Sequence, residues 1–231
     1  MKKKLNILIA DDHPWILDGL KKYLKKIRKV NQVFLASDGE EVINFIKKQE
    51  YHVDILFLDL RMKKKHGIET IVELYKMRCD VKIIVLTQFD DIQHLKPLYN
   101  LRIKVMLDKV NAIQDIPHAI NAVLKHEEYF SERIREHIKN IIKGKRKSEP
   151  RDILTPSLPP RRKEVLMYLI CTNLTQKEIA EKMNISFKTV DTHCRTIYEK
   201  DFNIHKRSEL VLKALLYGIV DYTDFFYFKS N

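Results

Sequence analysis

Short apolar runs alternate with amphipathic stretches along the first half of the chain. The amphipathic stretches have helical spacing and predict helices near 14–28, 40–50, 67–78, 91–99 and 112–124. Near-continuous apolar runs are typical of strands that helices cover on both faces. The pattern therefore predicts an α/β domain with a five-stranded, doubly wound parallel sheet. Its predicted strands are Leu5–Ala10, Val33–Ala36, Val53–Leu58, Val81–Leu86 and Ile103–Leu107.

The strand pattern is absent after Glu127. Isoleucines at helical spacing predict one helix over Ser131–Ile142, and the polar segment 143–150 is typical of a solvated linker. Arg161–Gly218 has a helical pattern throughout, with breaks near Asn173, Asn184 and Asn203. We therefore expect an α/β domain (1–125), a connecting helix and linker (126–153), an all-α four-helix domain (154–220) and an aromatic tail (221–231).

Composition and charge narrow the class of protein. Apolar residues form 45% of the 231 residues and charged residues 32%, which excludes a disordered chain. A net charge of +12 favours an anionic partner, although lysine enrichment alone would also produce it. No apolar run approaches the roughly 20 residues of a membrane helix. The three cysteines are odd in number and lack metal-type spacing, so we expect free thiols. We therefore expect a cytoplasmic protein with no membrane partner.

Acidic residues follow two of the predicted strands. Asp11 and Asp12 come at the end of the first strand, and Asp59 at the end of the third. Because the carboxyl ends of parallel strands meet at one edge of a sheet, the three carboxylates should share a crevice. Such a set suits Mg²⁺, and a carboxylate can attack phosphorus to give an aspartyl phosphate.

A hydroxyl and an ammonium group extend this set. Thr87 ends the fourth predicted strand and Lys109 follows the fifth, so both should face the same crevice and could bind phosphoryl oxygens. Any one of the five residues alone is weak support for a phosphate-binding or metal-binding site, because polar residues at strand ends are common. All five at successive strand ends are far less expected by chance.

Residues 4–124 resemble the receiver domain of two-component response regulators, a flavodoxin-like fold. The resemblance rests on Asp11-Asp12, Asp59-Leu60-Arg61-Met62 with Gly67, Thr87 and Lys109. It implies that Asp59 accepts a phosphoryl group from a histidine kinase, and that Thr87 and Lys109 bind that group. It also implies that Asp12, Asp59 and the Arg61 backbone carbonyl hold Mg²⁺, with Asp11 contributing through water.

Three positions depart from the receiver pattern. Lys63 replaces the proline after Met62, Gln88 replaces a small residue, and Met106 replaces the aromatic switch residue that partners Thr87. Methionine is flexible and can fill either of two packing arrangements. We therefore expect these three departures to affect the conformational switch that follows phosphorylation more than the binding of the phosphoryl group. Lys63, Lys64 and Lys65 form a charge run that is either solvated or attractive to acidic groups of a phosphodonor or partner.

The helical half contains a helix-turn-helix pattern. Thr175 is a suitable N-cap for one helix, Asn184-Ile185 forms the turn, and Ser186 caps the next helix. Lysine and threonine suit phosphate contacts, arginine can bind guanine, and aspartate can accept from cytosine. An ordinary amphipathic helix would carry similar charges. The outward face of the second helix carries Lys188, Thr189, Asp191, Thr192 and Arg195.

Leu154–Val220 resembles the LuxR-type helix-turn-helix domain, through Glu164-Val165-Leu166, Thr175–Ala180, Ile185-Ser186, Lys188-Thr189-Val190 and Ala214–Ile219. By that resemblance the second helix enters the major groove of promoter DNA. Asp191, Thr192 and Arg195 would then face bases, while Thr175, Gln176, Lys188 and Thr189 contact the backbone. The resemblance also implies a homodimer paired through the last helix, Arg207–Tyr217, whose apolar residues equally suit a monomer core.

Two other functions fit parts of the sequence. A haloacid-dehalogenase-type phosphotransferase also places an aspartate after an apolar strand, but it expects a second aspartate where Arg61 stands. A phosphorylation-independent DNA-binding regulator would use the receiver only for dimerisation, as Gln88 and Met106 allow. The complete set of five site residues favours a phosphorylated transcriptional regulator that is not an enzyme beyond its own phosphoryl transfer and dephosphorylation. The tail 221–231 either packs across its own domain or docks elsewhere.

Overall fold

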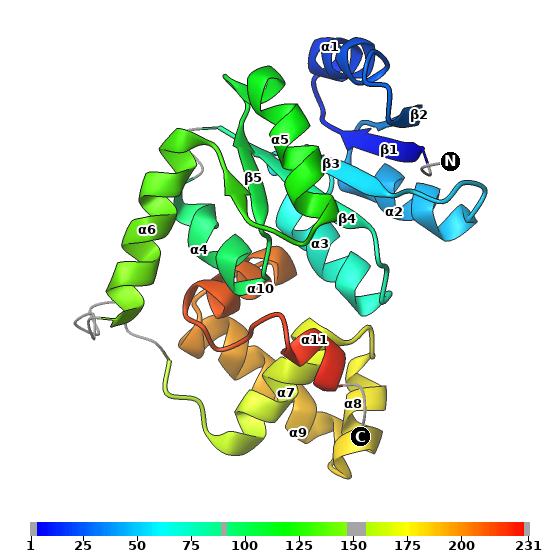
Figure 1. Ribbon diagram of the computed structural model, residues 1–231. Coiled ribbons are helices and arrows are strands. Elements are labelled where there is room, and N and C mark those ends of the chain that lie inside the picture. The colour runs from blue at the N-terminus through cyan, green and yellow to red at the C-terminus, as the bar shows by residue number, and fades with distance from the viewer. Residues whose placement is uncertain (1–3, 89–91, 147–155, 229–231) are drawn as a thin grey trace.

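A computed structural model describes residues 4–88, 92–146 and 156–228 as two packed domains (Figure 1). The N-terminal domain is built on a parallel sheet with strand order β2-β1-β3-β4-β5-β6. The strands are β1 (Leu5–Ala10), β2 (Val30–Ala36), β3 (Ile55–Asp59), β4 (Lys82–Thr87), β5 (Val105–Asp108) and β6 (Tyr129–Phe130). The α/β class and the doubly wound sheet are thus confirmed, with one strand more than predicted.

Helices cover both faces of this sheet. The apolar sides of α1 and α5 bury one face, and those of α2, α3 and α4 bury the other. Because both faces are covered, the central strand β3 is buried along its whole length. The helices are α1 (Pro14–Leu24), α2 (Gly39–Lys48), α3 (Gly67–Lys76), α4 (Ile92–Asn100) and α5 (Ala112–Leu124).

The C-terminal domain is entirely helical. Its helices are α7 (Pro160–Cys171), α8 (Gln176–Met183), α9 (Phe187–Thr196), α10 (Arg207–Leu216) and the short α11 (Asp224–Tyr227). A π-helical turn over Ile197–Asp201 extends α9. Asn184 and Asn203 adopt the left-handed conformation, with φ of 52° and 46°, which explains why the helical pattern breaks there. The predicted four-helix domain is confirmed, with α11 added from the aromatic tail.

The segment between the domains differs from the prediction. β6 pairs in parallel with β5, although the pattern predicts no strand after Glu127. Two residues are too short to leave a periodic pattern, which is why the sequence does not reveal this strand. The helix α6 (Glu132–Arg146) also continues through 143–146, where the polar composition predicts linker. The rest of that linker, 147–153, lies outside the described residues.

The domains share one hydrophobic core. α10 packs on α4, and α11 packs on α3 (Figure 1). The apolar residues of α10 are buried in a cluster that includes Leu95 and Leu98 of α4. None of the helices in the described ranges is long and apolar enough to cross a membrane. All three cysteines are free, as expected.

A buried hydroxyl fastens β6 to the end of β5. The Ser131 Oγ accepts a hydrogen bond from the Asp108 backbone N–H at 3.1 Å and donates one to Asp115. Tyr129 donates its phenolic hydrogen to the same Asp115 carboxylate at 2.7 Å. The added strand is therefore tied to α5 by side chains as well as by backbone pairing.

We predict that Ser131→Ala lowers the free energy of unfolding by about 1–3 kcal/mol, because it leaves the buried Asp108 N–H without an acceptor. Urea denaturation followed by circular dichroism measures the change. Ser37→Ala is the matched control, since Ser37 is exposed and its change should stay within about 0.5 kcal/mol. Equal stabilities of the two variants would contradict a role for this hydroxyl.

Candidate acidic metal site and nucleic-acid interface

Two carboxylates and one ammonium group meet at the carboxyl edge of the sheet. Asp11 follows β1, Asp59 is the last residue of β3, and Lys109 follows β5. The Lys109 Nζ lies 2.8 Å from Asp11 Oδ2 and 2.8 Å from Asp59 Oδ2. All three side chains are buried, with exposed fractions of 8% or less. The structure therefore places Asp11, Asp59 and Lys109 in contact.

His13 is a fourth member of the cluster that the sequence reasoning missed. Its Nδ1 lies 3.0 Å from Asp11 Oδ1 and 2.9 Å from Asp12 Oδ1. The His13 backbone N–H also donates to Asp11 Oδ1 at 2.9 Å. The position of His13 directly after two aspartates is the feature of the sequence that could have indicated this role. The imidazole helps to fix the orientation of both carboxylates.

Burial governs the protonation of Asp59. Desolvation is the largest influence and raises the pKa of this carboxyl above its ordinary value. The close contact and positive charge of Lys109 lower this pKa, the negative charge of Asp11 raises it, and the Arg61 backbone N–H lowers it. The net direction is upward. The pocket is thus electrostatically unfavourable for two ionised carboxylates. Additional positive charge in the pocket would reduce the repulsion between them.

The donor set fits a hard divalent cation. One oxygen or ring nitrogen from each of Asp11, Asp12, His13 and Asp59 lies within 4.8 Å of the others. Among the described residues, no well-aligned hydrogen-bond donor serves the buried Asp11 Oδ2, Asp12 Oδ1 or Asp59 Oδ2. Within the described residues, the Lys109 Nζ lies close to the Asp11 and Asp59 oxygens and the His13 Nδ1 lies close to the Asp12 oxygen. The three carboxylates of this set are the oxygen ligands that suit Mg²⁺.

Thr87 and Met106 lie next to this cluster on neighbouring strands. Thr87 ends β4, is buried, and accepts the Lys109 backbone N–H at its carbonyl at 2.9 Å. Its hydroxyl donates to the Gln88 carbonyl at 3.2 Å. Met106 is fully buried in the core on the α3–α4 side of the sheet. Thr87 is thus connected to Lys109 through its backbone carbonyl, whereas the Met106 side chain lies in the core.

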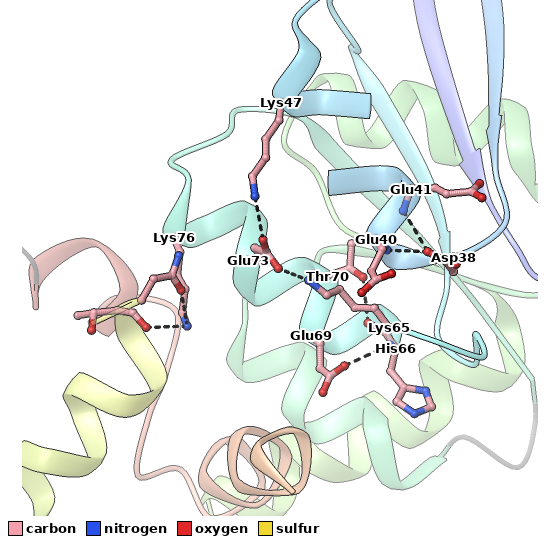
Figure 2. A network of polar contacts seen from close by, with 12 residues as sticks. Asp38, Glu40, Glu41, Lys47, Lys65, His66, Glu69, Thr70, Glu73 and Lys76 are labelled. Atoms are coloured by element: carbon pink, nitrogen blue, oxygen red, sulfur yellow. Dashed lines mark hydrogen bonds and ion pairs between the residues drawn. The ribbon is translucent and has the colours of Figure 1, made fainter. Parts of the chain in front are cut away.

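The loop after Asp59 is held by close backbone packing. A methyl group added at Gly67 would lie 2.5 Å from the Asp59 carbonyl oxygen, so only glycine fits there. Figure 2 shows Glu73 of α3 between Lys47 and Lys65, and the Lys47 contact is 3.4 Å. Lys64 lies 3.5 Å from Asp38. Two lysines of the charge run thus have structural partners in the free protein.

The helix-turn-helix is closed by the predicted caps. Thr175 accepts the Glu178 backbone N–H at 3.3 Å, and Glu178 in turn accepts the Thr175 backbone N–H at 2.7 Å. Ser186 accepts the Thr189 backbone N–H at 3.1 Å. These bonds satisfy backbone donors that a helix start leaves open, so both N-cap predictions are confirmed.

The polar face of α9 is exposed, but several of its groups are already engaged. The Thr192 hydroxyl donates to the Lys188 carbonyl at 2.8 Å, and Thr189 shares a hydrogen bond with Ser186 at 2.8 Å. Asp191 and Arg195 form an ion pair at 3.1 Å. Lys188 and Arg195 are the charged side chains of this face that extend into solvent. Their contacts with DNA, like those predicted for Thr175, Gln176, Thr189, Asp191 and Thr192, stay predictions.

Family models match both domains. Residues 7–121 match the response regulator receiver domain, and residues 156–214 match the bacterial regulatory proteins of the luxR family. The chain is also similar over nearly its full length to the response regulator protein VraR of Staphylococcus aureus. The two are 25% identical over 216 residues, which is 94% of this chain and 99% of VraR.

Solved structures of RcsB from Salmonella enterica serovar Typhimurium show the same two-domain fold. RcsB bound to a promoter with the phosphomimetic BeF₃⁻ is 27% identical, with a TM-score of 0.56, and covers 94% of this chain and 100% of its own. The isolated REC domain of RcsB is 31% identical, with a TM-score of 0.53, and covers 58% and 99%.

We predict that Asp59→Asn raises the thermal unfolding midpoint near neutral pH when Mg²⁺ is absent. The raised pKa means that folded Asp59 holds its proton more tightly than unfolded Asp59. The contribution of Asp59 to the free energy of unfolding therefore falls as the pH rises from 3.8, the ordinary pKa, through the higher pKa of the folded state. Asparagine does not ionise, so Asp59→Asn does not lose this stability. Melting curves between pH 4 and 8 in a chelator measure the effect.

Asp18→Asn, on the exposed side of α1, is the control and should leave the midpoint unchanged at every pH. Mg²⁺ should then stabilise the wild type more than Asp59→Asn, since the cation loses a carboxylate ligand in the variant. An Asp59→Asn protein that melts lower than wild type at neutral pH would show that the pair with Lys109 outweighs the burial cost.

Proposed function

We propose phosphorylation control on Asp59 for this chain, which belongs to the response regulators that join a receiver domain to a LuxR-type DNA-binding domain. Such a chain is a transcriptional regulator that binds DNA. One observation supports the control step above all others. Asp59 ends its strand 2.8 Å from the Lys109 ammonium, beside buried carboxylate oxygens that no well-aligned donor serves within the described ranges.

The residues suit a phosphoryl transfer to the Asp59 carboxylate. An Asp59 oxygen attacks the phosphorus of a phosphohistidine on a sensor kinase, the P–O bond forms, and the P–N bond breaks as the imidazole leaves. Lys109 then exchanges a carboxylate for a phosphoryl oxygen, and the Thr87 hydroxyl turns toward another. Bound Mg²⁺, held by Asp12, Asp59 and the Arg61 carbonyl with Asp11 through water, would neutralise charge on the transferring group.

This self-phosphorylation and its reversal are the only catalysis that we propose, so the chain is not an enzyme toward other substrates. Its proposed partners are a sensor histidine kinase, promoter DNA and a second copy of itself, in the cytoplasm. Two copies would place their α9 helices in successive major grooves, one helical turn apart. The similar protein RcsB binds a promoter in the presence of a phosphomimetic, which supports this sequence of events.

A phosphorylation-independent regulator is the second candidate. One observation favours it: Met106 is fully buried where the receiver resemblance expects an aromatic switch residue. Without a ring that follows the Thr87 hydroxyl, phosphate could be bound and yet leave the DNA-binding domain unaffected. A comparison of DNA binding with and without a phosphodonor separates the two candidates.

We expect acetyl phosphate with Mg²⁺ to raise the DNA affinity of the wild type about 5- to 100-fold and to leave Asp59→Asn unchanged. The DNA is a duplex selected from a random library by the wild-type protein, and fluorescence anisotropy measures binding. Asp18→Asn, which keeps the phosphoacceptor, should respond as the wild type does. Equal responses of wild type and Asp59→Asn would support the phosphorylation-independent candidate.

Two variants of α9 test the DNA surface. Arg195→Ala should lose about 1–3 kcal/mol of discrimination between selected and scrambled duplexes, because arginine binds a base edge. Lys188→Ala should weaken both duplexes alike and lower the salt slope by about 1. Lys125→Ala removes a positive charge from the receiver and is the control for net charge. Normal discrimination by Arg195→Ala would contradict the groove assignment.

A further inference from the structure

One exposed aromatic side chain stands at the start of α9. Phe187 is the first residue of this helix and is 48% exposed. Among the residues of the C-terminal domain whose burial the structure describes, it is the only large hydrophobic side chain that is exposed. The nearby Ile185 instead packs against the hydrophobic core. Packing within the domain therefore does not account for a phenyl ring at this position.

Phe187 stands where the polar and the buried sides of α9 meet. It precedes the buried Val190 by three residues and Asp191 by four, so helical spacing makes it a surface neighbour of both. Val190 is fully buried, whereas one turn earlier the phenyl ring is exposed. Phe187, Asp191 and Arg195 also form a row of residues four apart. The ring thus extends the row of proposed base-reading residues to the N-terminus of the helix.

The turn before α9 fixes the position of this ring. Asn184 ends α8 in the left-handed conformation, and the Ile185 backbone N–H donates to the Ala180 carbonyl at 3.0 Å. Ser186 then caps α9 with its hydroxyl oxygen. Because helical side chains lean toward the N-terminus of their helix, the Phe187 ring projects ahead of the first turn. The ring is therefore held at the leading end of α9 before any DNA is bound.

The space beside the ring is open to a large ligand. Phe187 borders a surface groove whose other lining residues belong to α8 and to the turn, among them Lys177 and Asn184. Lys177 is exposed and supplies a positive charge on the α8 side of this groove. α8 and α9 lie on the side of the C-terminal domain away from the parallel sheet (Figure 1). The ring is therefore accessible in the free chain as it stands.

The chemistry of a phenyl ring narrows what it can contact on DNA. The ring has no conventional hydrogen-bond donor or acceptor, so it cannot pair with the polar groups of a base edge. The apolar group that a base pair presents in the major groove is the C5-methyl of thymine. Burying that methyl against a ring removes apolar surface of both from water, and cytosine lacks the methyl. A phenyl ring in the major groove therefore favours thymine.

We propose that Phe187 is a specificity-determining residue that contacts a thymine methyl in each half of the DNA site. It adds an apolar contact to the row in which Asp191 and Arg195 suit a cytosine and a guanine. The inference rests on the proposed placement of α9 in the major groove. It is independent of phosphorylation control at Asp59, because the ring is already exposed in the unphosphorylated chain.

The test removes the ring and the methyl group separately, in the full chain. The selected duplex is synthesised again with deoxyuridine in place of each thymine in turn, which deletes only the methyl group. Phe187→Ala deletes the ring, and melting curves establish that this variant is folded. Tyr51→Ala is the matched control, because Tyr51 is an aromatic residue of the receiver with a similar exposure of 46%. Fluorescence anisotropy measures each affinity.

We expect deoxyuridine at one thymine of a half-site to weaken binding by wild type and by Tyr51→Ala about 3- to 10-fold. Phe187→Ala should bind the thymine and deoxyuridine duplexes equally, because the methyl group has lost its partner. Phe187→Leu keeps an apolar side chain and should retain part of the preference for the methyl group. A ring that only shaped the turn would behave differently: its loss would weaken both duplexes alike and leave the sensitivity to the methyl group in place.

Either of two results would overturn the inference: a wild type that tolerates deoxyuridine at every thymine, or a folded Phe187→Ala that stays as sensitive as wild type. Arg195→Ala separates this failure from a failure of the proposed DNA surface. If Arg195→Ala loses discrimination while Phe187→Ala keeps its sensitivity to the methyl group, the inference is wrong and the groove assignment stands. If Arg195→Ala discriminates normally while Phe187→Ala loses that sensitivity, the base-reading role of Arg195 is wrong and the Phe187 contact stands.

Discussion

The balance of charge inside the acidic pocket is the constraint on which the receiver depends. Asp11 and Asp59 are withdrawn from water, and two close carboxylates repel one another. The Lys109 ammonium, 2.8 Å from each, supplies the opposite charge that makes their burial tolerable. The parallel register that aligns the ends of β1, β3 and β5 keeps the three groups together. Gly67 helps to hold Asp59 in this position, because only a glycine lets the loop after Asp59 pack against the Asp59 carbonyl.

The sequence was most informative where a regular pattern constrains position. Five strands and the convergence of Asp11, Asp59 and Lys109 were predictable, because a parallel sheet brings strand ends to one edge whatever the details of packing. β6 was not predictable, since two residues carry no period. His13 was missed because a histidine after two aspartates is equally at home in a solvated loop, and only the folded chain places its Nδ1 beside both carboxylates.

Contacts between the domains also lay beyond the sequence. The apolar stripe of α10 predicts burial, but a stripe does not say what covers it, so a dimer seam and a monomer core were equally acceptable. In the structure the apolar residues of α10 are buried in the core of the single chain, as the monomer-core interpretation expects, and α10 also packs on α4 of the receiver. The aromatic tail is similar: its composition predicts burial, whereas its partners, Tyr75 and Arg102, are about 150 and 120 residues away in sequence and follow no local rule. One core therefore joins the receiver domain to the DNA-binding domain.

The ion pair on α9 has a consequence for how the protein chooses among sites. In the free chain one Nη of Arg195 donates to Asp191 at 3.1 Å, so a base would meet a guanidinium that is already paired with a carboxylate. A guanine with a neighbouring cytosine offers partners for each, because it presents acceptors to arginine while the cytosine amino group donates to aspartate. Other base pairs leave one charge unmatched against the phosphates. If α9 lies in the major groove as proposed, the internal pair would compete with the bases for Arg195. Because both side chains are exposed, we expect this competition to contribute about 1 kcal/mol or less.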